Sequence, residues 1–182
     1  MDTFNANRRK LLALGGAALG VALLPTQAFA SLSTSRPRVL TLSNLNTGEN
    51  LKTEFFNGKS YDKNELARLN HFFRDYRANK VKSIDPHLFD QLFRLQTMLD
   101  TRKPVQLVSG FRSLSTNNSM RTHSKGVAKH SYHTLGQAMD FHIEGIALSN
   151  VRKAALALRA GGVGYYPSSN FVHIDTGPIR HW

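Results

Sequence analysis

Two short segments in which apolar and polar residues alternate constrain the fold of this chain more than any other feature. Residues 137–143 and 170–176 show the period of two that is typical of β-strands with one buried face. Asp140 and His142 then share the polar face of the first strand, and His173 lies on the polar face of the second. If the two strands are neighbours, their apolar faces can pack against helices while Asp140 and His173 meet in one cleft.

The remaining sequence predicts a single α+β domain. Residues 38–43 and 50–56 are strand-like, and the turn chemistry between them predicts a hairpin. Apolar stripes at helical spacing predict one helix from Asp62 through Tyr76 and a second that begins at Asp85. The second half predicts a buried strand at 104–108, a long polar loop at 114–131, a helix at 148–159 ended by Gly161-Gly162, and a terminal strand pair at 163–165 and 170–176.

The first thirty residues are typical of an export signal. A charged segment, Asn7-Arg8-Arg9-Lys10, precedes the moderately apolar run 11–24, and Ala28-Phe29-Ala30 resembles a cleavage site. Paired arginines before a weakly hydrophobic run favour the twin-arginine route over an ordinary secretory signal. We therefore expect residues 1–30 to be removed and residues 31–182 to act outside the cytoplasm without a membrane span. An uncleaved signal anchor is the less favoured alternative.

Composition excludes several kinds of site and partner. The chain has no cysteine, so disulfides are excluded and a tight metal site must use His, Asp or Glu. The formal net charge of +12 favours an anionic partner. For an exported protein, a polyanionic polymer of the cell envelope is a better candidate than nucleic acid, because the basic residues lack interleaved aromatic side chains for stacking. A solvated basic surface without a specific partner is the alternative.

Two histidines and one aspartate, His133, Asp140 and His173, form a candidate metal site. His133 precedes Asp140 by seven residues, an odd spacing that would place the two side chains on opposite faces of one strand, so we expect His133 on the turn before it. A catalytic zinc takes three protein ligands of this kind and keeps a fourth position for water. His142 is a rival ligand because it shares the face of Asp140.

Three motifs spread over the second half of the chain carry a family resemblance. They are Ser-Gly-Phe-Arg-Ser at 109–113, Ser-x-His-x-x-Gly-x-Ala-x-Asp at 131–140 and Phe-Val-His-Ile-Asp at 171–175. Together they resemble the zinc D-Ala-D-Ala peptidase superfamily, which also includes lysostaphin-type enzymes and the Hedgehog signalling domain. The resemblance spans nearly all of residues 31–182.

This resemblance implies a fold, a cofactor and a reaction. The fold is a small antiparallel sheet flanked by helices, and the cofactor is one zinc ion per chain bound by His133, Asp140 and His173. The implied reaction is hydrolysis of peptidoglycan peptide cross-links in the periplasm during cell-wall remodelling, at the bond between two meso-diaminopimelate residues. The alternatives are a carboxypeptidase that trims terminal D-Ala and a murein-binding module without catalytic activity.

The resemblance assigns a role to Arg112 but leaves the general base open. Arg112 matches the arginine of the family's site, and its planar guanidinium suits a substrate carboxylate or an oxyanion; the alternative is a surface arginine paired with a local acid. Many relatives carry a Glu or His base shortly before the last ligand, where this chain has Asn170 and Phe171. The candidates for the base are His130 and Asp175, followed by His142, Glu144 and His181. Asp175 could instead accept a hydrogen bond from His173.

Overall fold

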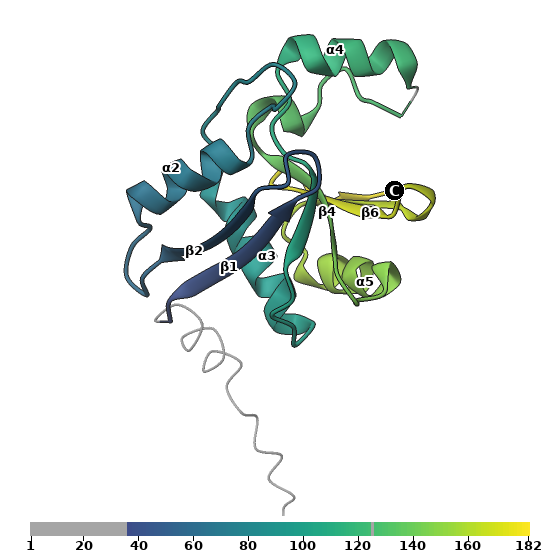
Figure 1. Cartoon of the computed structure of the whole chain (residues 1–182). Coiled ribbons are helices and arrows are strands. Elements are labelled where there is room, and N and C mark those ends of the chain that lie inside the picture. The colour runs from purple at the N-terminus through teal and green to yellow at the C-terminus, as the bar shows by residue number, and fades with distance from the viewer. Residues whose placement is uncertain (1–35, 125) are drawn as a thin grey trace, which may run out of the picture. The chain divides into compact units, whose positions relative to one another are not determined.

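A seven-stranded sheet runs through the part of the chain that this computed structural model describes, residues 36–124 and 126–182 (Figure 1). The strand order is β2-β1-β3-β4-β6-β5-β7. The strands are β1 (Arg38–Asn44), β2 (Asn50–Phe56), β3 (Val105–Ser109), β4 (Ala138–Ile143), β5 (Gly162–Tyr166), β6 (Phe171–Asp175) and β7 (Arg180–His181). The expected signal at 1–30 and the residues up to 35 lie outside this part.

The α+β class is confirmed, but the implied small antiparallel sheet is wrong in size and in direction. The predicted hairpin forms from β1 and β2, and β6 pairs antiparallel with both β4 and β5. However, β3 lies parallel to β1, and β7 lies parallel to β5. Two helices intervene between β2 and β3, which lets the chain return to the other side of β1 in the same direction.

Helices form where apolar residues recur at helical spacing and where a side chain caps the first turn. Asp62 accepts hydrogen bonds from two backbone N–H groups at the start of α2, and Asp85 does the same for one N–H of α3. The helices α3 and α5 pack together and cover one face of the sheet (Figure 1). The helices are α2 (Lys63–Phe72), α3 (Pro86–Met98), α4 (Leu114–His123) and α5 (Leu148–Leu158).

Two predicted helix ends and one predicted loop are wrong. The first helix ends at Phe72 rather than reaching Tyr76, because the chain turns there into a bridge between Asp75 and Lys80. Helix α5 ends with Arg159 in the left-handed conformation, with φ of 48°, so the two glycines that follow are not its cap. The supposed polar loop at 114–131 contains α4.

Helix α4 forms although few of its residues are apolar. Its N-cap, Ser113, accepts a hydrogen bond from the backbone N–H of Thr116. The Ser113 hydroxyl and backbone N–H both donate to Asp75 Oδ2, at 2.7 and 2.9 Å. The helix therefore starts at a point that is fixed by a buried carboxylate from a distant part of the chain.

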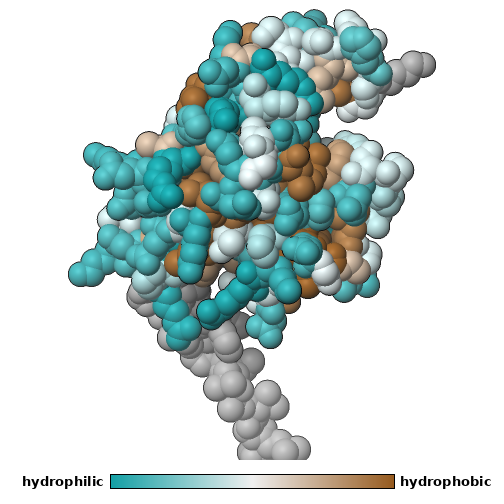
Figure 2. Space-filling view, in the orientation of Figure 1, coloured by the Kyte–Doolittle hydropathy of each residue, from teal (hydrophilic) through white to brown (hydrophobic). Residues whose placement is uncertain are grey.

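The surface is mostly polar, and it is hollowed beside α4. Figure 2 shows hydrophilic side chains over most of the visible face and a notch between the part formed by α4 and the strands below it. Within the described residues, no helix is both long enough and apolar enough to cross a bilayer.

Candidate metal centre

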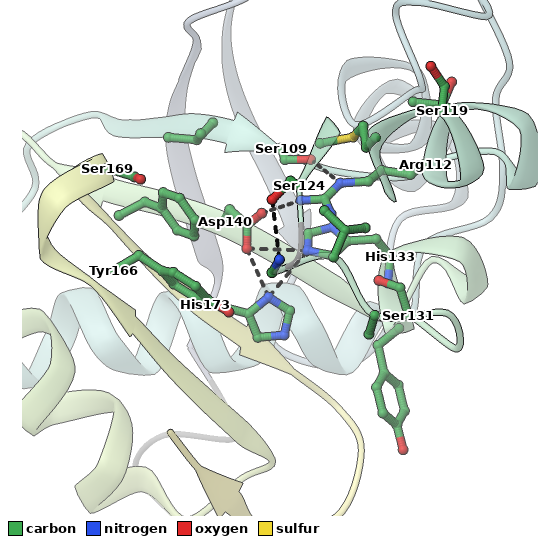
Figure 3. A pocket seen from close by; sticks show the side chains of 18 of the residues that line it. Ser109, Arg112, Ser119, Ser124, Ser131, His133, Asp140, Tyr166, Ser169 and His173 are labelled. Atoms are coloured by element: carbon green, nitrogen blue, oxygen red, sulfur yellow. Dashed lines mark hydrogen bonds and ion pairs between the residues drawn. The ribbon is translucent and has the colours of Figure 1, made fainter. Parts of the chain in front are cut away.

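The three candidate ligands converge on one point, and all three side chains are buried (Figure 3). The distance from His133 Nε2 to Asp140 Oδ1 is 3.2 Å, and the distance from His133 Nε2 to His173 Nδ1 is also 3.2 Å. His173 Nδ1 lies 2.8 Å from Asp140 Oδ1. The sequence predicts that these residues share one cleft, and the structure brings their side chains together.

His133 is positioned by a short turn and by a backbone acceptor. The turn is the 3-10 helix η1 (Tyr132–Leu135), whose N-cap Ser131 accepts a hydrogen bond from the His133 backbone N–H. The turn ends at Gly136 with φ of 72°, where a Cβ would lie only 2.5 Å from the Ser83 carbonyl oxygen. His133 Nδ1 lies 2.7 Å from the Gly110 carbonyl oxygen, to which it donates, and Nε2 is left free for a metal.

His173 is positioned by its strand and by a carboxylate. It lies on β6 directly opposite Asp140 on β4 in the antiparallel register. Its Nε2–H donates to Asp175 Oδ2 at 3.0 Å, which leaves Nδ1 facing Asp140. Asp175 is completely buried and also accepts hydrogen bonds from the backbone N–H groups of Gly162 and Gly177.

Arg112 is not a surface residue, and its partner is a candidate ligand. Only 9% of the residue is exposed, and its Nη2 donates to Asp140 Oδ2. Its Nε donates to Ser109 Oγ at 2.8 Å. The guanidinium thus neutralises the carboxylate from behind and leaves Asp140 Oδ1 directed at the two imidazoles.

Burial and hydrogen bonding act in opposite directions on the ionisation of the three candidate ligands. Burial alone would raise the pKa of Asp140, but its interactions with His133 and His173 hold that pKa well below the usual range. Burial is the largest effect on His133 and lowers its pKa, which favours the neutral form. For His173, hydrogen bonds to Asp140 and Asp175 outweigh burial and raise the pKa.

The three residues lie in a cleft of about 1220 Å³ between α4 and the strands β4 and β6. His123 and His130 line this cleft, as does Phe171. The other base candidates are elsewhere: Asp175 is buried behind His173, and the cleft lining does not include His142, Glu144 or His181.

Three contributors to the site had no clear signal in the sequence. The Gly110 carbonyl that fixes His133 is a backbone group, and Asp75 acts through Ser113, which lies 38 residues away. Trp182 lines the cleft, with its ring 5.4 Å from that of His173. For the Gly110 carbonyl, the sequence offers one hint, which is that Gly110 falls within the motif that contains Arg112.

Comparison with known proteins identifies the family. Residues 32–182 match the family model described as "Peptidoglycan L,D-endopeptidase MepK". The chain belongs to this peptidase family. It is 76% identical over 182 residues to proteins of that name from Escherichia coli K12 and Shigella flexneri, with all of both chains covered. A Haemophilus influenzae protein named "Probable peptidoglycan L,D-endopeptidase MepK" is 48% identical, over 100% of this chain and 98% of that one. No solved structure matches significantly.

The family assignment confirms the resemblance drawn from the three motifs, and peptidases of this family are in general zinc-dependent. The donor set of the centre suits that ion. Two imidazole nitrogens and one carboxylate oxygen are ordinary zinc ligands, and ligands of a tetrahedral zinc lie about 3.3 Å apart when the bonds are about 2 Å long. The observed separations of 2.8 to 3.2 Å are close to that value. Each imidazole also has an acceptor for its other nitrogen, as ligating histidines normally do.

Proposed function

We propose that this chain is a zinc-dependent endopeptidase that hydrolyses L,D peptide cross-links of peptidoglycan, at the bond between two meso-diaminopimelate residues. The observation that carries the proposal is the convergence of His133, Asp140 and His173 in a cleft, in a chain that shares 76% of its residues with peptidoglycan L,D-endopeptidases. Strands β4 and β6 and the turn η1 position the three donors.

The roles of the protein groups follow from their positions. His133 Nε2, Asp140 Oδ1 and His173 Nδ1 would hold one zinc ion, which supplies a Lewis acid and lowers the pKa of bound water to about 7. Arg112 orients Asp140 through its hydrogen bond to Oδ2, and it also lines the cleft, where its remaining N–H groups can face a substrate carboxylate or a developing oxyanion.

The charge of the cleft suits a carboxylate-rich substrate. Arg77, Arg112 and Arg180 line it, and among the described lining residues Asp140 is the only acid. Diaminopimelate stem peptides carry several carboxylates, so a cationic cleft attracts them. This balance of charge supports peptidoglycan rather than a cationic peptide as the substrate.

His130 is the base candidate that the cleft favours. It lies on the cleft wall, whereas Asp175 is completely buried outside the cleft lining, and both of its carboxylate oxygens accept hydrogen bonds. We therefore assign Asp175 to the support of His173 and propose His130 as the group that exchanges protons with the reacting water and leaving group.

The proposed place of action is the periplasm, where peptidoglycan lies. The sequence of residues 1–30 supports this location, because it has the charged, apolar and small-residue segments of an export signal. Residues 31–182 would then be the mature enzyme, with no nucleic-acid partner.

The test is mass spectrometry of muropeptides after digestion of purified murein, with and without a chelator. We expect cross-linked species to be converted to monomers, and we expect chelation to stop the conversion and added zinc to restore it. Loss of terminal D-Ala from monomers, with cross-links intact, would instead identify a carboxypeptidase. Zinc bound at one per chain without any turnover would identify a binding module.

A further inference from the structure

Strand β5 has glycine at two of the three positions on the face that it turns toward the metal centre. Alternate residues of a strand share a face, and on β5 that face carries Gly162, Gly164 and Tyr166. Gly164 lies opposite His173 in the antiparallel register with β6. Neither glycine has a left-handed φ, so backbone conformation is not what requires glycine there.

The side chains of Arg180, on β7, and of Trp182, directly after β7, fill the space above these glycines. Strand β7 is separated from β6 by β5, so their backbones lie roughly 10 Å apart. Even so, Arg180 Nη2 donates to Asp175 Oδ2 at 2.6 Å, and the Trp182 ring centre lies 5.4 Å from that of His173. Both contacts reach β6 across the part of β5 that carries the two glycines.

The two glycines are what make this reach sterically feasible. A Cβ on Gly164 would lie 2.8 Å from two atoms of the Trp182 ring, and a Cβ on Gly162 would lie 2.5 Å from Arg180 Nη1. Contacts of that length force one partner to move. An alanine at position 164 would therefore lift the indole away from β5 and change its contact with His173.

The indole is held in place from several directions. Trp182 Nε1 donates to Tyr166 Oη at 2.7 Å, and the Trp182 backbone exchanges hydrogen bonds with Val163 and Tyr165. The Arg180 guanidinium lies 5.2 Å from the centre of the Trp182 ring. A ring fixed in this way limits the rotation of the imidazole beside it, while Arg180 fixes the carboxylate that accepts the His173 N–H.

We propose that Arg180 and Trp182 are positioning residues for the metal centre, which hold His173 from across a strand that is bare at Gly162 and Gly164. Arg180 acts through Asp175, and Trp182 acts through direct contact with the imidazole. The proposal rests on the proposed function only in taking zinc as the ion. Its consequence is that a single methyl group at position 164, whose nearest neighbours would be atoms of the Trp182 ring, weakens metal binding.

The test is a double-mutant cycle read by zinc affinity. Gly164→Ala and Trp182→Ala should each weaken zinc binding by about 10- to 100-fold, the range found when groups that orient metal ligands are changed. In the Trp182→Ala background, Gly164→Ala should have no further effect, because the added methyl group then has no ring to displace. That background is the matched control for the glycine substitution.

Fluorescence reports on the ring directly, because Trp182 is the only tryptophan of the chain. Its emission should shift in Gly164→Ala and should respond to zinc in the wild-type protein. Trp182→Phe keeps an aromatic ring but loses the N–H donor, and Tyr166→Phe removes the acceptor of the same hydrogen bond. We expect both to retain zinc affinity within a fewfold of wild type.

Other outcomes would overturn the proposal. Wild-type zinc affinity in Gly164→Ala, or equal losses from this substitution with and without the tryptophan, would show that the ring contact does not position His173. A lowered melting temperature of the metal-free protein, with zinc affinity unchanged, would show a purely structural role. Zinc binding by the wild type without murein cleavage would end the proposed function alone, and absence of zinc binding by the wild type would end both.

Discussion

The two imidazoles of the metal centre are held by different kinds of partner. The acceptor for His133 is a backbone carbonyl, that of Gly110, in the loop between β3 and α4. The acceptor for His173 is a side chain, Asp175, and Arg180 and Trp182 surround that pair. The first imidazole is fixed by the path of the chain and the second by a set of side chains at the edge of the sheet.

The His133 side is also tied to the hydrophobic core. A Cβ on Gly110 would lie 2.6 Å from the Phe73 carbonyl oxygen, and the same oxygen accepts the Phe111 backbone N–H at 2.8 Å. Phe73 is itself fully buried against Phe89. Changes on this side should therefore cost folding stability with little loss of metal affinity, whereas changes on the His173 side should cost metal affinity. The following predictions test that difference.

Removal of any ligand should have the largest effect. We expect His133→Ala, Asp140→Ala and His173→Ala each to reduce murein cleavage to the detection limit, because a site with two protein ligands does not retain zinc. Circular dichroism should show folded protein in all three. Retained hydrolysis in any two of the variants would contradict the assignment of the ligands.

Arg112→Met should lower kcat/KM by about 10²-fold, the typical effect of removing one group that stabilises developing charge. The variant also leaves the Asp140 carboxylate without its buried counter-charge, so zinc affinity should be measured in parallel. Arg112→Lys is the matched control, since it restores the charge but not the planar pair of donors. If Met and Lys variants were as active as wild type, Arg112 would have no role in the reaction.

Asp175→Asn tests the His173 side. The change keeps the size of the side chain but removes the charge that accepts the His173 N–H, so zinc affinity should fall by about 10- to 100-fold. Calorimetric or competition titrations with zinc measure this. Because the buried Asp175 also accepts hydrogen bonds from Gly162, Gly177 and Arg180, the free energy of unfolding of the metal-free protein should fall as well. Unchanged zinc affinity in this variant would contradict the difference between the two sides.

Asp75→Asn tests the His133 side and should have the smallest effect on zinc binding. The buried Asp75 carboxylate accepts hydrogen bonds from Ser113, Arg77 and Ala78, so its replacement should cost about 1–3 kcal/mol in the free energy of unfolding. Urea unfolding at neutral pH measures this cost.

The same variant has a predicted pH dependence. Burial alone would raise the pKa of Asp75, but the hydrogen bonds outweigh it and lower the pKa, so the carboxylate stabilises the fold above its unfolded pKa of about 3.9. The difference between wild type and Asp75→Asn should therefore shrink as the pH falls below about 4 and disappear once the folded carboxyl is protonated. A difference that stayed constant down to pH 2 would contradict this account.

Much of the fold and all three candidate ligands could be predicted from the sequence because their signals are local. The alternation around Asp140 and His173 fixes two strands, and Asp62 and Asp85 mark helix starts. The position of His133 also follows from the sequence. Its spacing of seven residues from Asp140 excludes the shared face of one strand, and Gly136 allows a turn, so His133 must lie in the loop before β4.

The remaining features depend on contacts between distant residues, which no local pattern reveals. Helix α4 is mostly polar, so its sequence resembles a loop. Its start depends on the hydrogen bond from Ser113 to the distant Asp75. Strand β7 has only two residues and pairs in parallel, which gives no periodic signal. The burial of Arg112 against Asp140, and the place of Trp182 beside His173, depend in the same way on how the strands are ordered.

Strands β4 and β6 keep the apolar core and the metal centre on opposite faces. Phe141 and Val172 are buried among core residues, while Asp140 and His173 face the cleft. In small zinc fingers the ion is what makes folding favourable, so its removal unfolds the chain. Here the fold has a hydrophobic core of its own, so we expect the protein to stay folded when the ion is removed. If the proposed function holds, hydrolysis would then follow the supply of free metal reversibly, and removal of the ion by a chelator would not destroy the enzyme.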